Sequence, residues 1–293
     1  DTQDDALRSF AVFVQDQIAI GDRLDITAGL RWTRLEINTR YIFAGTPAVD
    51  SDTVEERFTP RLGATYEITD GLSAFVGYSE GFQGLVAAFG VTDPKPEESI
   101  AWDGGLKFAA PIDGLSGTVS VYQITRRNVV TGDPVNPFAS TQTGEQRARG
   151  IELDLIYEPS PAFSLLASYA YTDAVVTQDN ILPIGARPAR VPEHSGRLAA
   201  RYRFLDGAWA GFEIGGGLTY VGERELTLPN TLRAASAVTL DAQASYDFGR
   251  FTLAVSAVNL TDSDHVEPYA YLDQAVVIPA QPRSAFLTLR ANF

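Results

Sequence analysis

Apolar and polar side chains alternate along most of the chain. In residues 237–248, Val238 and Leu240 stand on either side of Thr239, and residues 24–33 follow the same period. A period of two residues is typical of a β-strand whose two faces meet different surroundings. We therefore predict an all-β protein of about thirteen strands. The predicted strands are residues 6–20, 23–40, 56–69, 72–82, 98–109, 114–126, 143–158, 162–177, 192–205, 210–222, 237–248, 250–259 and 283–293.

Short and long connections alternate between these strands. The short ones contain turns such as Gly21-Asp22 and Asp113-Gly114, in which glycine permits a positive φ angle. This alternation is typical of a transmembrane antiparallel β-barrel, which has tight periplasmic turns and long outer loops. A soluble sandwich has no reason to keep two classes of connection. The predicted long connections lie near residues 41–55, 83–97, 127–142, 178–191, 223–236 and 260–282.

Aromatic residues cluster near the ends of the apolar faces, as the interfacial girdles of a membrane barrel require. These residues are Trp32, Tyr66, Phe108, Tyr157, Tyr169, Tyr171, Tyr220 and Phe248. The strand at residues 6–20 fits this pattern poorly, because Asp16 shares a face with Val14 and Ile18.

Composition narrows the possible functions. The net charge of -14 and the lack of a block of lysine and arginine argue against a nucleic-acid partner. The chain has no cysteine, which excludes disulfides, thiolate metal sites and cysteine nucleophiles. His194 and His265 are far apart, and no Gly-x-Ser-x-Gly turn is present. We therefore predict no catalytic residues, no metal site and no enzymatic activity.

The strand count and the start of the chain predict that the sequence is part of a larger barrel. Bacterial single-chain barrels close with an even number of strands, whereas about thirteen are predicted here. The chain begins with Asp1, contains no methionine and has no signal segment at its start.

The order of several short strings carries a family resemblance. They are residues 58–63 (FTPRLG), 78–82 (YSEGF), 144–153 (GEQRARGIEL), 191–194 (VPEH), 220–224 (YVGER) and 259–262 (NLTD). With these strings, residues 1–293 resemble the C-terminal part of the β-barrel of TonB-dependent outer-membrane receptors, in their ferric-siderophore branch. The resemblance implies about the last thirteen strands of a 22-stranded barrel, with the plug domain absent from this chain.

The same resemblance implies a function and a set of partners. We expect uptake of a ferric siderophore across the outer membrane of a Gram-negative bacterium, energised by TonB, ExbB and ExbD through an N-terminal region. The iron travels as the chelate, so no cofactor is expected. Other expected partners are outer-membrane lipid, lipopolysaccharide and the barrel-assembly machinery, which reads the terminal Phe293. The barrel is expected to be a monomer with a periplasmic C-terminus.

Charged residues at alternate strand positions are expected to face the lumen, because a lipid-facing charge is costly. These residues are Arg31, Arg61, Arg201, Arg203, Arg290, Asp25, Glu67, Asp103, Glu152, Asp154, Glu213 and Asp241. In the string from Gly144 to Gly150, we interpret the glycines as relief of backbone crowding or a bulge.

Ligand binding is expected in or beside the long connections. A ferric chelate presents a broad, partly apolar and often anionic surface, which aromatic faces and cations can hold. The candidate residues are Tyr41, Phe43, Phe82, Phe89, Arg126, Arg127, Phe138, Tyr269 and Tyr271.

Two other functions fit the same pattern. A passive porin-like channel needs no plug, and a surface-binding barrel uses its loops to hold macromolecules. Within the resembling family, haem, cobalamin and oligosaccharide are alternative cargoes.

Overall fold

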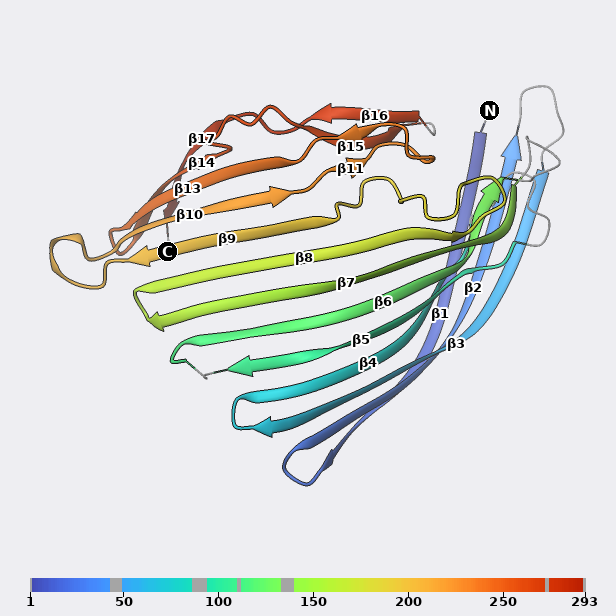
Figure 1. Cartoon of the computed structure of the whole chain (residues 1–293), viewed down its shortest axis with the longest axis horizontal. Coiled ribbons are helices and arrows are strands. Elements are labelled where there is room, and N and C mark those ends of the chain that lie inside the picture. The colour runs from blue at the N-terminus through green and yellow to red at the C-terminus, as the bar shows by residue number, and fades with distance from the viewer. Residues whose placement is uncertain are drawn as a thin grey trace.

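The computed structural model describes residues 2–42, 49–85, 94–109, 112–132, 140–271 and 274–291. Thirteen strands form one antiparallel sheet, in which they lie side by side in the order of the chain (Figure 1). The strands of this sheet are β1 (Thr2–Ile20), β2 (Leu24–Ile42), β3 (Val49–Thr69), β4 (Leu72–Gln83), β5 (Glu97–Ala109), β6 (Leu115–Gly132), β7 (Ser140–Ser160), β8 (Phe163–Gln178), β9 (His194–Arg203), β10 (Phe212–Val221), β13 (Ala237–Asp247), β14 (Phe251–Val258) and β17 (Ser284–Ala291).

Each predicted strand overlaps one strand of the sheet, so the all-β prediction and the strand count are confirmed. The glycine turns are confirmed too, with φ angles of 61° at Gly21 and 78° at Gly114. Among the described residues, no helix is long and apolar enough to span a membrane.

The structure corrects four of the predicted long connections. Those at residues 41–55 and 127–142 are shorter than predicted, because β2 extends to Ile42, β3 begins at Val49, β6 extends to Gly132 and β7 begins at Ser140. Residues 223–236 contain a small hairpin of β11 (Arg224–Glu225) and β12 (Arg233–Ala234), and residues 260–282 contain β15 (Val266–Tyr271) and β16 (Gln274–Pro279). A short 3₁₀ turn, η1 (Gly207–Trp209), follows β9. Two-residue strands are too short to show a period in the sequence, so periodicity could not find β11 and β12.

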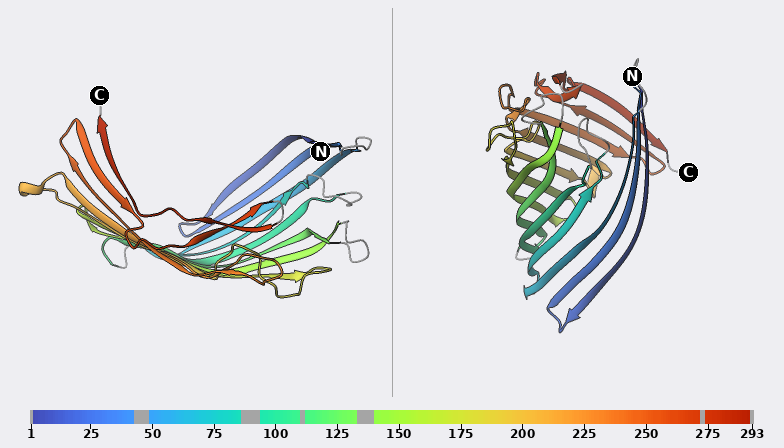
Figure 2. Two further views of the ribbon diagram at one scale, coloured as in Figure 1. Left: turned by 90° about the horizontal axis from the view of Figure 1, so that it is seen from above. Right: turned by 90° about the vertical axis from the view of Figure 1, so that its right-hand side faces the viewer.

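The sheet bends into an open trough, with β1 and β17 at its two edges (Figure 2). These edge strands do not pair with each other in the described part of the chain. Long sheets with a right-handed twist curve in this way when neighbouring strands are tilted, as in a barrel wall.

The register assigns every residue to one face of the sheet, because directly paired residues point the same way. Trp32 in β2 pairs with Val12 in β1 and Phe58 in β3, for example. Following this register across the sheet gives one face that is apolar over its middle. Its residues include Leu30, Leu62, Val76, Leu106, Val119, Leu153, Leu198, Leu218, Leu240, Val255 and Leu287.

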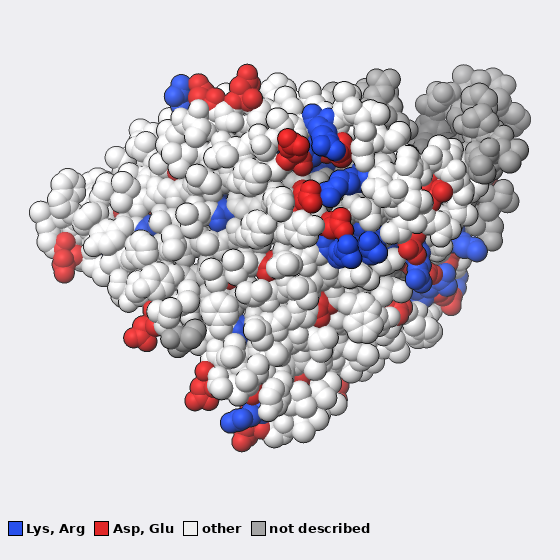
Figure 3. All heavy atoms as spheres, viewed as in Figure 1, with Lys and Arg blue, Asp and Glu red and all other residues white. Residues whose placement is uncertain are grey.

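The opposite face carries all the charges that were predicted to face the lumen, from Arg31 in β2 to Arg290 in β17. Hollows of the trough are lined by such residues, including Asp25 and Arg61 in one and Glu152 and Asp154 in another. We call this the concave face and the other the convex face. The convex side is shown in Figure 3, where uncharged atoms cover the middle and charges gather toward the strand ends.

The polarity of both faces changes along β2 and β3. In the lower segment (residues 24–32 and 58–66), the convex face is apolar and ends at Trp32 and Phe58. In the upper segment (residues 33–42 and 49–57), the convex face carries polar residues such as Arg34 and Glu56, which lie 2.6 Å apart. A hydrogen bond to Glu56 and a weaker effect of one to Glu36 raise the pKa of Arg34 above its ordinary value.

The concave face of the upper segment is buried. Leu35 and Ile37 are 8% and 2% exposed, and Thr33 and Thr39 flank them. Gly84, which follows β4, lies so close that a side chain there would clash with Leu35 and Ile37. The backbone after β4 therefore covers this part of the wall and forms a small apolar core inside the trough.

Candidate ligand-binding surface

The structure describes only part of the predicted ligand-binding set. Three of its members and the predicted assembly signal lie outside the described residues: Phe43, Phe89, Phe138 and Phe293. Three others lie in strands β2 and β15, where only their backbone is described: Tyr41, Tyr269 and Tyr271. The remaining members can be placed by their contacts.

Arg126 and Arg127 point to opposite faces of β6. Arg126 is paired with Ser99 in β5. It donates a hydrogen bond to Glu97, two positions before Ser99 in the same strand. The Nε atom of Arg127 lies 3.1 Å from a carboxylate oxygen of Glu145 in β7. The two arginine side chains are 48% and 55% exposed. Both predicted cations are thus paired with carboxylates while keeping an open surface.

Phe82 lies near the end of β4, where it pairs with Glu98 and shares a face with Tyr78. The rings of Tyr78 and Trp102 are 4.4 Å apart on this convex face. Glu98 in turn pairs with Arg127, so Phe82 and Arg127 belong to the same cross-strand row. The structure therefore places Phe82 and Arg127 in one convex-face row, on either side of Glu98, and Arg126 on the opposite face. Contact of these residues with a chelate stays a prediction.

The glycines of residues 144–150 have the structural role expected for them. A side chain at Gly150 would meet the carbonyl of Tyr171 and the ring of Tyr122. The register with β6 shifts between Arg127 and Val129, opposite Gly144. Gly150 therefore relieves backbone crowding and Gly144 lies beside a bulge, the two roles predicted for these glycines.

Ion pairs also cross the concave wall lower down. Arg203 in β9 lies 2.7 Å from Glu213 in β10, and Arg197 lies 3.9 Å from Asp241 in β13. The ammonium of Lys107 stands 4.8 Å from the centre of the Phe75 ring. This wall is polar and suits a lumen filled by water or by polar protein surface.

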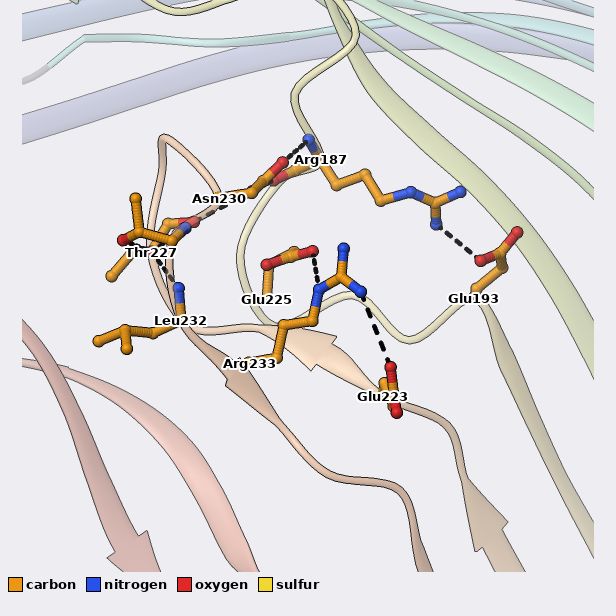
Figure 4. Close-up of polar contacts among 9 residues, drawn as sticks. Arg187, Glu193, Glu223, Glu225, Thr227, Asn230, Leu232 and Arg233 are labelled. Atoms are coloured by element: carbon orange, nitrogen blue, oxygen red, sulfur yellow. Dashed lines mark hydrogen bonds and ion pairs between the residues drawn. The ribbon is translucent and has the colours of Figure 1, made fainter.

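A network of charged residues, which the sequence analysis did not predict, joins the connection between β8 and β9 to the one between β10 and β13 (Figure 4). Arg187, between β8 and β9, lies 3.2 Å from Glu193. Arg233 in β12 lies 2.7 Å from Glu225 in β11. The backbone N–H of Arg190 donates to the carbonyl of Glu225 at 2.8 Å, which joins the two connections.

The amide side chain of Asn230 adds a second link between these connections. The backbone N–H of Arg187 donates to Asn230 Oδ1 at 2.7 Å, and Asn230 Nδ2 donates to the carbonyl of Arg187 at 2.8 Å. The hydroxyl of Thr227 accepts hydrogen bonds from the backbone N–H groups of Thr231 and Leu232. The turn that carries Asn230 is therefore fixed by its own hydrogen bonds.

Arg224 extends the network to β15. Its guanidinium lies 2.7 Å from Glu267, and Glu267 also stands 3.5 Å from the imidazole of His265. Arg224 and Glu225 are only 6% and 5% exposed. Buried charges persist only when they are paired, so these contacts hold the connections together as one unit, which we call the rim cluster.

The rim cluster offers fixed charges rather than reactive groups. Among the described residues, no group of three or more histidine, aspartate or glutamate side chains could hold a metal ion. Sequence spacing gave no signal for the cluster, because Arg224 and Glu267 are 43 positions apart. The only hint was the alternation of acidic and basic residues in 223–225.

Comparison with known proteins agrees with the fold. A family model described as TonB dependent receptor-like, beta-barrel matches residues 1–260. The metal-pseudopaline receptor of Pseudomonas aeruginosa is 30% identical over 302 residues, which cover 100% of this chain and 42% of that protein. The ferrichrome outer membrane transporter/phage receptor of Escherichia coli is 32% identical over 268 residues, covering 87% and 34%.

A solved structure is similar over the same extent. The siderophore receptor PiuA from Acinetobacter baumannii superposes with a TM-score of 0.88 at 21% identity, over 98% of this chain and 43% of that one. The chain thus spans less than half the length of these relatives. Together with the sheet order and the apolar convex face, these matches show that the chain belongs to the family of TonB-dependent outer-membrane receptors and forms part of their β-barrel.

Proposed function

We propose that the chain is part of the barrel wall of a receptor that takes up a ferric siderophore, with transport energised through TonB. The observation that carries this proposal is the match along the whole chain to a receptor named for a metal chelate, metal-pseudopaline. The ferrichrome transporter, which matches 87% of the chain, adds a second named chelate.

In this proposal the long connections face the outside and the C-terminus is periplasmic. The chelate is the cargo and meets aromatic and cationic groups above the wall, the set around Tyr269, Tyr271, Arg126 and Arg127. The rim cluster supports this surface, because Arg224 pairs with Glu267, two positions before Tyr269. Coupling to TonB, ExbB and ExbD belongs to other parts of the receptor.

Growth under iron limitation tests the proposal. A strain that lacks its other siderophore receptors and expresses the full-length receptor is given a panel of purified ferric hydroxamates, catecholates and mixed chelates. We expect rescue by one chelate or one class, and loss of rescue when TonB is deleted. Rescue without TonB would favour a passive channel, and no rescue by any chelate would contradict siderophore uptake.

The tyrosines of β15 give a local test. Tyr269→Ala with Tyr271→Ala in the full-length receptor is expected to weaken chelate binding and leave barrel assembly intact. Tyr220→Ala is a matched control, because this tyrosine lies within strand β10 of the wall and not in a long connection. Unchanged affinity in the double variant would remove both tyrosines from the site.

A further inference from the structure

Asp16 is a charged residue in a place where the rest of the wall is apolar. We call the apolar belt the convex-face positions between the outer aromatic residues and the short turns, such as Leu24 to Trp32 in β2. The register places Asp16 in this belt, between Val14 and Ile18 on the same face of β1. Val14 is 68% exposed and Ile18 is 46% exposed.

Asp16 also lies at the middle height of the belt. It pairs with Ala28, the central position between Leu24 and Trp32, and Ala28 pairs with Leu62. Among the described residues, Asp16 is the only charged side chain in the apolar belt of any strand. In an outer-membrane barrel this surface faces lipid, where an unpaired carboxylate is strongly disfavoured.

The described part of the wall does not compensate this carboxylate. One oxygen accepts a hydrogen bond of 2.9 Å from the backbone N–H of Gln17. None of the ion pairs among the described residues includes Asp16. A single backbone N–H leaves the negative charge without a counter-charge.

β1 has one free edge, since it pairs only with β2 in the described sheet. In lipid, unpaired backbone groups at such an edge must find partners. The relatives are more than twice as long as the matched region, so their chains can supply further wall. A strand paired with β1 would place one side chain directly beside Asp16 on the convex face.

We propose that, in the complete receptor, a further strand of the same barrel pairs with the free edge of β1 and carries a lysine or arginine beside Asp16. A basic partner is inferred because it neutralises the carboxylate in a medium of low dielectric constant, where such pairs are strong. The pair also fixes the register of this seam, because a slip by one residue moves the basic side chain to the other face.

The direction in which Asp16→Leu changes the thermal stability of the full-length receptor tests the proposal. Asp16→Leu is expected to lower the temperature at which the folded form is lost on heating in detergent, because it leaves the basic partner unpaired. Asp16→Glu is the matched control and is expected to preserve that temperature. If Asp16 faces bare lipid, Asp16→Leu raises the temperature, and the proposal is overturned.

Labelling provides a second readout that does not depend on the Leu variant folding. Dicyclohexylcarbodiimide, which enters lipid, modifies carboxyl groups that are exposed there and not ion-paired. In the wild-type receptor we expect no adduct on Asp16 by mass spectrometry, whereas the control variant Val14→Asp is expected to be labelled at position 14. An adduct on Asp16, or a receptor dimer that Asp16→Leu dissociates, would overturn the assignment to a strand of the same barrel.

Discussion

Two side chains on the convex face of β3, Leu62 and Val54, are equally exposed, at 51% and 52%. Leu62 lies in the lower segment between Phe58 and Tyr66, where every convex neighbour is apolar. Val54 lies in the upper segment beside Glu36, among charged and polar residues. The same face of the strand is therefore apolar at one height, as contact with lipid requires, and polar at another, as contact with water favours.

The concave face changes in the opposite sense. In the lower segment it carries polar residues such as Thr27 and Arg61. In the upper segment it carries the buried Leu35 and Ile37, covered by the chain at Gly84. Alternation thus marks a strand, but the solvent on each side decides which face is apolar. The predictions below test this difference between the two segments.

The largest difference is expected between Leu62→Arg and Val54→Arg in the full-length receptor. An arginine facing lipid near the middle of a bilayer destabilises a barrel by about 2–4 kcal/mol. Val54→Arg places the same charge in water beside Glu36 and is expected to change stability by less than about 1 kcal/mol. Reversible unfolding in lipid vesicles measures both, and equal effects would contradict the assignment of the two heights.

Ile37→Ala tests the buried side of the upper segment. Truncating a buried isoleucine removes apolar contact and leaves a cavity, and the lower end of the usual range, about 2 kcal/mol, is expected because the covering chain can relax. Ile26→Ala, on the lipid-facing side of the same strand, leaves no enclosed cavity and is the control. Hydrogen exchange of the β2 amides above Trp32 reports the loss, and protection unchanged by Ile37→Ala would show that this core does not stabilise the upper segment.

The rim cluster extends the comparison to the other end of the sheet, with a smaller expected effect. The Glu225 carboxylate is buried and paired with Arg233, whereas Asp262 and Arg283 form an exposed pair at 3.0 Å. Glu225→Gln is expected to reduce the local stability of β11 and β12 by about 1 kcal/mol. Asp262→Asn is expected to change the stability of its own connection by at most a few tenths of a kcal/mol. Amide exchange at Arg190, whose N–H binds the Glu225 carbonyl, measures the first effect.

Most of the fold could be predicted because the alternation of apolar and polar residues within each strand indicates the surroundings of its two faces. Glycine at positions such as 21 and 114 marked the turns, and alternation placed the charges from Arg31 to Arg290 on one face. Asp16 was recognised as an exception from the same alternation. The upper segment was harder, because its polarity depends on height above the membrane and on the chain that covers it.

The candidate site could be predicted only as a set of residue types in long connections. Neither the ion pair of Arg127 with Glu145 nor that of Arg224 with Glu267 has a local sequence signal, since each depends on how separate strands come together. The short strands β11 and β12 are likewise fixed by contacts with the segment around Arg187 rather than by their own pattern. Tertiary contacts override weak local preferences in such connections.

The smallest effect is expected at Arg34, on the water-facing side of the upper segment. Its guanidinium is hydrogen-bonded to Glu56 and Glu36, yet its side chain is 42% exposed. Water screens such pairs, so Arg34→Gln should leave the unfolding of the receptor unchanged within error, and high salt should not alter that result. Because the pKa of Arg34 is raised, any contribution of its charge to the stability of the folded receptor is present below its ordinary pKa and is lost only at higher pH. The effect of Arg34→Gln is therefore expected to be independent of pH between about pH 6 and 9. A clear loss of stability in Arg34→Gln would place this part of β2 in lipid and move the boundary between the two segments above Trp32.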